Sequence, residues 1–211
     1  MVEDRPAAPS FDLSGGAPCL DFANTWADRG RPETESLRGY GDLVAFALQA
    51  GLLSGGHAAR LAGRAARHPR AAAAGFAQGR GLREDLYRIF SATAARRAPA
   101  AADLERLNAA LPAALSRLRL ARRGAGFAWT WAEPAAPGKA ALAAPLWPIL
   151  RSAADLLASD ASKQVRECAG AACTWLFLDR SRNRSRRWCS MDTCGNRAKA
   201  RRHYHRKSDG G

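Results

Sequence analysis

The segment CAGAACTWLFLDRSRNRSRRWCSMDTC, residues 168–194, carries four cysteines in two pairs near the C-terminus. Four residues separate the members of each pair, and fifteen residues separate the two pairs. Two short loops that each supply two thiolates can surround one tetrahedral ion, and this spacing is typical of a structural zinc site. We therefore predict that Cys168, Cys173, Cys189 and Cys194 bind one Zn2+, which folds the segment and leaves no open position for catalysis.

The alternatives to a metal site are two disulfides or four unrelated buried thiols. The first sixteen residues, MVEDRPAAPSFDLSGG, have early acidic residues and lack the apolar stretch of a secretory signal. We therefore expect a reducing, cytoplasmic location, which favours zinc over disulfides. Arginine or a helix breaker interrupts every Ala- and Leu-rich stretch, so we expect no membrane span.

Basic residues are concentrated around the four cysteines. Residues 163–211 contain 13 Lys and Arg against 4 Asp and Glu, a net charge of +9, whereas the other 162 residues carry +5 of the total of +14. Such a segment can neutralise phosphates and release the counterions condensed on a nucleic acid. Compositional bias is the simpler alternative, since 29 of the 33 basic residues are arginine. That bias explains arginine in place of lysine, but not the scarcity of acidic residues at one end.

The rest of the chain has the apolar periodicity of helices, and 47% hydrophobic content over 211 residues is enough for one ordinary core. We predict amphipathic helices over residues 36–51, 54–68, 70–97 and 103–111 or beyond. We expect Pro112 to kink or divide the last of these. A final core helix is predicted over residues 140–159, with Pro145 and Pro148 in its first turns or breaking them.

Residues 118–121 and 127–131 alternate on both sides of a glycine-containing turn, which predicts a β-hairpin. We expect its aromatic row, Phe127, Trp129 and Trp131, to pack on the helices; the alternative is that these rings form the floor of a ligand pocket. Earlier in the chain, we expect Cys19 to be a small buried hydrophobe. Asp21 and Asn24 are expected to cap an early helix and not to line a pocket.

The predicted fold class is mainly α, of the α+β type. We expect a flexible leader over residues 1–16, a helical domain with a small β-hairpin over residues 17–159, and a four-cysteine domain over residues 163–207 that ends in a basic helix. The last of these is called the zinc domain.

Within the zinc domain, residues 175–178 (WLFL) predict an apolar strand that covers the metal, and Trp188 is expected to close the other side. The polar residues 180–187, the basic loop, have no apolar residue to hold their tip, so we expect them to contact phosphates. Residues 196–207 predict a basic helix that begins at the metal and can enter a major groove. The candidate nucleic-acid contacts are Arg180, Arg182, Arg184, Arg186, Arg187, Asn196, Arg197, Lys199, Arg201, Arg202 and Arg206. The alternative for the helix is a solvated tail.

The residues WCSM (188–191) and CGNR (194–197) resemble the CGNR zinc-finger family, and FLDRS (177–181) after the first cysteine pair is similar to its first half. The stretches LDFANT (20–25) and ALQAGLL (47–53) resemble the ABATE domain of stress-induced transcription regulators, which is usually paired with this zinc finger. The resemblance implies four cysteine ligands, a bacterial transcription factor, a helical domain that senses a signal or dimerises, and a zinc finger that holds DNA.

We therefore expect a DNA-binding transcription regulator that is not an enzyme, with a small molecule or stress as its signal and a homodimer as its possible assembly. An RNA-binding or ribosome-associated zinc module is the alternative. Readers of single-stranded RNA expose aromatic rings for stacking, whereas Trp175, Phe177 and Trp188 are needed inside the zinc domain and only Tyr204 is left.

Two further alternatives involve the chemistry of the zinc domain. An HNH-like metal nuclease would use Asn196, His203 and His205, but the acids that we find nearby to hold a second metal are Asp192 and Asp209. A redox sensor would release zinc when its thiolates are oxidised, and the basic loop would then need another explanation.

Overall fold

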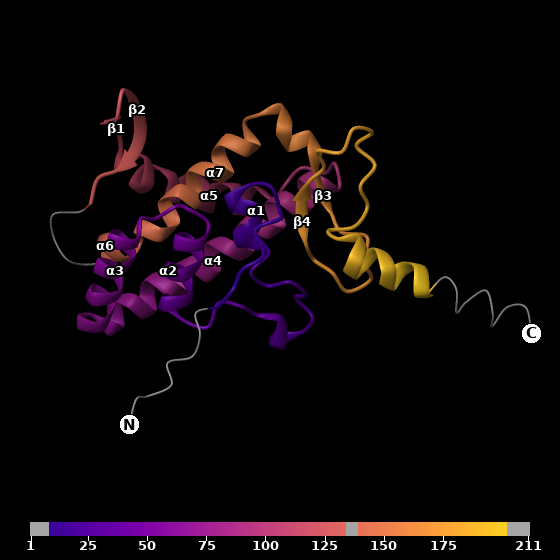
Figure 1. Cartoon of the computed structure of the whole chain (residues 1–211), viewed down its shortest axis with the longest axis horizontal. Coiled ribbons are helices and arrows are strands. Elements are labelled where there is room, and N and C mark those ends of the chain that lie inside the picture. The colour runs from indigo at the N-terminus through magenta and orange to yellow at the C-terminus, as the bar shows by residue number, and fades with distance from the viewer. Residues whose placement is uncertain (1–8, 134–138, 202–211) are drawn as a thin grey trace, which may run out of the picture.

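The computed structural model describes residues 9–133 and 139–201, and it is mainly helical, as predicted (Figure 1). The helices are α1 (Pro18–Ala23), α2 (Tyr40–Gln49), α3 (Gly55–Arg67), α4 (Pro69–Ala94), α5 (Ala101–Leu115), α6 (Lys139–Leu142) and α7 (Trp147–Leu157), with short 3-10 turns η1 (Pro32–Thr34), η2 (Ala144–Leu146) and η3 (Asp160–Gln164). Strand β1 (Leu118–Arg123) pairs with β2 (Gly126–Trp131), and β3 (Val165–Glu167) with β4 (Leu176–Leu178), both antiparallel. No helix of the described residues has the length and apolar content to cross a membrane.

The core forms around α4, the longest helix, which packs against α1, α2 and α5 and against strand β3 of the zinc domain. Leu86, Ile89 and Phe90 of α4 are fully buried at its centre. Val165 and Leu176 of the zinc domain belong to the same apolar cluster. One continuous core therefore joins the helical domain to the base of the zinc domain.

Local signals at the helix ends and at proline explain most of the helix boundaries. The Ser54 side chain accepts a hydrogen bond from the backbone N–H of His57 and so caps α3. Pro112 lies inside α5 and does not divide it, because it sits in the last turn, where one lost backbone bond matters least. The helix predicted over residues 140–159 is divided into α6, η2 and α7, with Pro148 in the first turn of α7, a position that proline favours.

The aromatic row of the β1–β2 hairpin does not pack on the helices as we expected. Phe127 is 73% exposed and Trp129 is 57% exposed, and only Trp131 reaches the core, where its ring lies 6.1 Å from that of Trp147. The hairpin projects from the end of α5 beyond the helices (Figure 1), and above its base Trp129 meets them only through the Arg151 guanidinium of α7, 5.0 Å from the centre of its ring.

The leader is also more ordered than its composition predicts. Phe11 is buried, with its ring edge-on to that of Phe46 at 5.4 Å between centroids. The side-chain amide of Gln49 accepts from the backbone N–H of Phe11 and donates to its carbonyl. Residues 9–16 are therefore part of the folded domain, whereas residues 1–8 lie outside the described part of the chain.

Candidate metal centre and nucleic-acid surface

The four predicted cysteine ligands meet at one point of the zinc domain. Cys168 follows β3 and Cys173 precedes β4, whereas Cys189 precedes and Cys194 lies within a π-helical turn, η4 (Met191–Gly195). Their four sulfurs lie within 4.8 Å of one another. The Cys173–Cys189 and Cys189–Cys194 sulfurs are 3.8 and 3.7 Å apart. Zn–S bonds of about 2.3 Å in a tetrahedron place sulfurs about 3.8 Å apart, so this donor set fits one structural Zn2+.

The protonation of these thiols shows why the cluster needs a cation. Hydrogen bonds from the neighbouring thiols, that of Cys189 foremost, lower the pKa of Cys173 to about 6. The same hydrogen bond to Cys173 raises the pKa of Cys189, and burial raises the pKa of Cys194. One thiolate is therefore stabilised by its neighbours, but four adjacent thiolates repel one another unless a divalent ion compensates their charge.

Groups around the cysteines hold them in place. The backbone N–H of Cys189 donates to the Cys168 sulfur at 3.3 Å. A Cβ atom at Gly170 would lie 3.1 Å from the Cys173 Cβ and 3.2 Å from the Cys194 sulfur, so the tight packing between Cys168 and Cys173 favours glycine there. Phe177 is fully buried against the cysteines, with Trp175 and Trp188 partly buried beside it, as we predicted. Metal binding and the packing of this small apolar cluster therefore stabilise the same arrangement of the four cysteines.

A buried carboxylate, which our sequence analysis missed, holds the basic loop. Asp179 accepts hydrogen bonds through one oxygen from the Ser181 backbone (3.0 Å) and hydroxyl (2.6 Å), and through the other from the Arg186 backbone (3.0 Å). Burial alone would raise the pKa of Asp179, but these hydrogen bonds lower it below its ordinary value. The carboxylate is therefore a permanent anchor for both ends of the loop. The Asp-x-Ser sequence at 179–181, which is typical of an Asx turn, was the available signal.

The arginines of the basic loop have different environments. Arg182, Arg184 and Arg187 are exposed and have no acidic partner within the described residues. Arg180 donates to the Gly16 carbonyl at 3.1 Å. Arg186 differs from these neighbours, because its guanidinium donates to the Trp188 and Cys189 carbonyls and lies 4.4 Å from the centre of the Phe177 ring. It therefore packs within the zinc domain and has fewer N–H groups available for phosphate than its exposed neighbours.

The basic helix begins at the metal centre, as expected, and is described over residues 196–201. Arg197, Lys199 and Arg201 are exposed on it, and Asn196 donates to the Asp192 carbonyl at 3.4 Å. A hollow of about 220 Å3 beside the metal centre is lined by Arg197, Arg201 and Arg31, the last a basic residue of the helical domain that our sequence analysis did not include. The remainder of the predicted helix, residues 202–207, lies outside the described residues, and it includes the candidate contacts Arg202 and Arg206.

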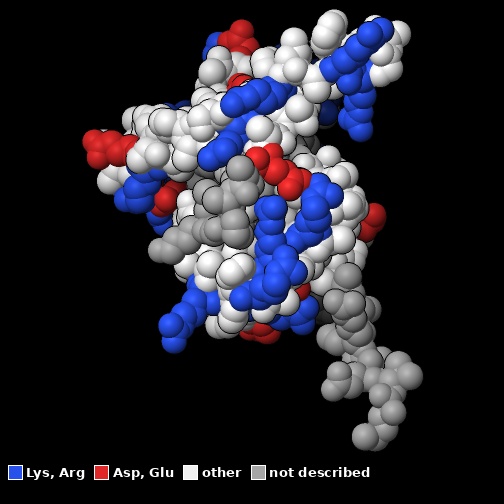
Figure 2. All heavy atoms as spheres, turned by 90° about the vertical axis from the view of Figure 1, so that its left-hand side faces the viewer, with Lys and Arg blue, Asp and Glu red and all other residues white. Residues whose placement is uncertain are grey.

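Charge alone does not single out the zinc domain. Figure 2 shows the face at the opposite end of the molecule, which carries α3 and the hairpin, and basic side chains outnumber acidic ones there too. A test of nucleic-acid binding therefore has to compare the two basic regions directly.

The zinc domain is docked on the helical domain through one edge of β4. The Asn24 side chain donates to the Leu176 carbonyl and accepts from the Leu176 N–H, each at 2.8 Å, and the Leu178 N–H donates to the Gly15 carbonyl at 2.9 Å. Asp21 accepts from the Gly15 N–H at 2.7 Å. The prediction that Asp21 and Asn24 cap an early helix is therefore wrong, because α1 has no side-chain cap. Asn24 bonds β4 directly, and Asp21 holds Gly15, whose carbonyl accepts from β4.

Two family models match the chain. ABATE, described as "Putative stress-induced transcription regulator", matches residues 16–160, and the CGNR zinc finger matches residues 164–207. No curated protein matches the chain. Both resemblances noted in the sequence are confirmed.

Proposed function

We propose that this chain, which belongs to the ABATE family and carries a CGNR zinc finger, regulates transcription by binding DNA through its zinc domain. The observation that carries the proposal is the pair of exposed basic segments on the two sides of one metal centre. The basic loop lies between the two cysteine pairs, and the basic helix begins within two residues of Cys194. Zinc therefore fixes the two segments relative to each other.

The basic helix is suited to a groove of duplex DNA. Arg197 and Arg201 are four residues apart, so they share one face of the helix, and Lys199 extends its positive charge. The guanidinium group of an arginine can form two hydrogen bonds with the edge of a guanine in the major groove. Arginines of the loop, such as Arg182 and Arg184, can contact phosphates. We assign phosphate contact to the loop and groove contact to the helix.

The aromatic residues of the zinc domain support duplex DNA over single-stranded RNA. Trp175, Phe177 and Trp188 pack around the cysteines, so Phe177 offers no face for base stacking and the two tryptophans are only partly exposed for it. We also propose a binding role and no enzymatic one, because four thiolates fill the coordination sphere of a zinc ion and leave no place for an activated water. The helical domain then supplies the regulation.

The test is selection of binding sites from a random duplex DNA pool by the zinc-loaded full chain, with a structured RNA pool in parallel. We expect an enriched DNA motif whose binding weakens steeply with salt and is lost in Cys168→Ser. Equal, motif-free retention of both pools would overturn sequence-specific DNA binding.

A further inference from the structure

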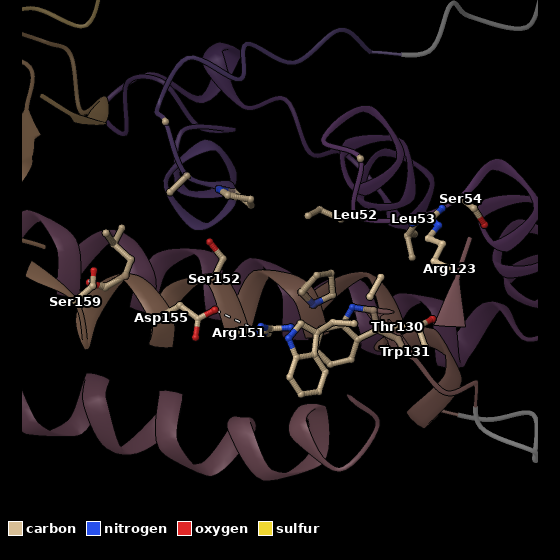
Figure 3. Close-up of a pocket in the computed structure, with 18 of the residues that line it drawn as sticks. Leu52, Leu53, Ser54, Arg123, Thr130, Trp131, Arg151, Ser152, Asp155 and Ser159 are labelled. Carbon is tan, nitrogen blue, oxygen red and sulfur yellow. Dashed lines mark hydrogen bonds and ion pairs between the residues drawn. The ribbon is translucent and has the colours of Figure 1, made fainter. Parts of the chain in front are cut away.

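A large cleft lies in the helical domain, and none of the four cysteine ligands lines it. Its volume is about 1000 Å3, at the upper end of the range for small-molecule sites. One wall is a face of α7 that includes Arg151, Ser152 and Asp155, followed by Ser159 beyond the end of that helix (Figure 3). The other walls are the hairpin, the loop at 51–54 and residues 16–18. At one end, Leu178 and Arg180 of the zinc domain complete the lining.

The charges that line this cleft favour an anion. Arg122, Arg123, Arg151 and Arg180 face a single acidic side chain, Asp155. Asp155 lies 3.3 Å from Arg151, but its carboxylate is 68% exposed and the pair is therefore well hydrated and weak. The positive charge of the lining remains largely uncompensated, and a cation or a second copy of the arginine-rich hairpin would be repelled.

The cleft also offers a flat apolar surface beside this charge. The Trp129 ring is more than half exposed, and the Arg151 guanidinium lies 5.0 Å from its centre. Leu52, Leu53 and Leu156 supply apolar lining. The Ser152 hydroxyl, which accepts from the Cys19 N–H at 3.2 Å, adds a polar group to this wall of the cleft. An aromatic ring fits the apolar part, and an acidic group fits the arginines.

We propose that this cleft binds a small aromatic organic anion, with its ring against Trp129 and its carboxylate or sulfonate at Arg151. This inference rests on the proposed function, because the bound anion would be the signal that regulates DNA binding. Arg180 directly follows Asp179, the anchor of the basic loop, and its guanidinium holds the Gly16 carbonyl. An anion that competes for Arg180 therefore acts on the loop that we assign to phosphate contact.

The test is a fluorescence titration of the zinc-loaded full chain with 1-anilinonaphthalene-8-sulfonate, an aromatic sulfonate, in the absence of nucleic acid. We expect saturable binding at one site. Arg151→Gln and Trp129→Ala each raise the Kd at least tenfold. Two matched variants on the same hairpin but outside the lining, Arg119→Gln and Phe127→Ala, change the Kd less than twofold.

A competition experiment tests the charge requirement. We expect 1-naphthoate to displace the probe and the neutral 1-naphthamide to be at least tenfold weaker. The proposal is overturned by non-saturable binding, by equal losses in the matched variants, or by equal displacement with the amide. Because no DNA is present, a failure of DNA binding leaves these outcomes unchanged, and the two proposals fail separately.

Discussion

The side-chain amide of Asn24 forms two hydrogen bonds with the backbone of Leu176, 152 residues further along the chain. The amide therefore takes the place of a neighbouring strand at the free edge of β4, between the helical domain and the metal centre. The zinc domain is consequently held in one orientation on its partner domain and is not tethered by a free linker. A change in the helical domain thus has a physical path to the zinc domain.

Replacement of Asn24 by alanine is expected to weaken this docking. Asn24→Ala leaves the buried N–H and C=O of Leu176 without partners, at a cost of about 2–5 kcal/mol in the free energy of unfolding. Urea unfolding of the zinc-loaded chain measures this cost. Asn183→Ala, an exposed asparagine of the basic loop, is the matched control and is expected to change stability by less than about 0.5 kcal/mol. An Asn24→Ala variant as stable as the control would show that the two hydrogen bonds do not hold the domains together.

Loss of the Asp179 carboxylate is expected to release the basic loop while the metal stays bound. Asp179→Ala removes three hydrogen bonds, so we expect trypsin to cleave after the loop arginines about tenfold faster. Limited proteolysis followed by mass spectrometry measures the rate and the sites. Asp192→Ala, at an exposed aspartate of the same domain, serves as the control. Unchanged cleavage in Asp179→Ala would contradict an anchoring role.

Asp21 predicts a dependence of stability on pH. Burial raises the pKa of Asp21 to about 6, against an ordinary value of 3.8. Between these values the folded state binds more protons than the unfolded state, so this group's stabilising contribution is complete below pH 4 and is lost as the pH rises to about 6. Asp21→Asn retains an acceptor for the Gly15 N–H, and because the amide does not ionise, the variant does not lose stability as the pH rises. We expect the variant to gain about 1–2 kcal/mol relative to wild type between pH 4 and pH 7.5.

Urea unfolding with excess zinc at pH 4, 5, 6 and 7.5 tests this prediction, because the difference between the two proteins isolates the carboxyl group from zinc release and from other titrating residues. A constant difference across this pH range would mean that Asp21 titrates normally.

The metal ligands are expected to behave differently from the fifth cysteine. Cys19 is fully buried, and burial raises its pKa to about 12. We therefore expect wild type and Cys19→Ala to hold one zinc per chain, and Cys168→Ser to hold less than half of that after dialysis. After chelation, a thiol reagent should modify four cysteines rapidly and Cys19 only on unfolding. Zinc loss in Cys19→Ala equal to that in Cys168→Ser would contradict this ligand set.

The sequence best predicts those features that depend on the spacing between residues close together in the chain. The four ligands were found because thiolates four residues apart can bind one ion, and the helices because their apolar residues repeat every three or four positions. The pairing of Asn24 with Leu176 has no such signal, since nothing local indicates which strand edge an amide will meet. Whether an aromatic side chain is buried also depends on tertiary structure, which the local sequence does not indicate. The alternation in the hairpin predicted strands, but not that Phe127 and Trp129 would project beyond the core. Likewise, Arg186 is indistinguishable in sequence from its exposed neighbours.

The central claim is that zinc presents the exposed arginines of the zinc domain to DNA. Its most direct test is the salt dependence of the Kd for a selected duplex, measured with two triple variants of equal charge change. One replaces Arg182, Arg184 and Arg187 by Gln, and the other replaces Arg119, Arg122 and Arg123 of the hairpin. We expect the loop variant to lower the slope of log K against log salt by about 3 and to weaken binding, while the hairpin variant retains the wild-type slope. Equal losses in both variants, or none in the loop variant, would contradict the account.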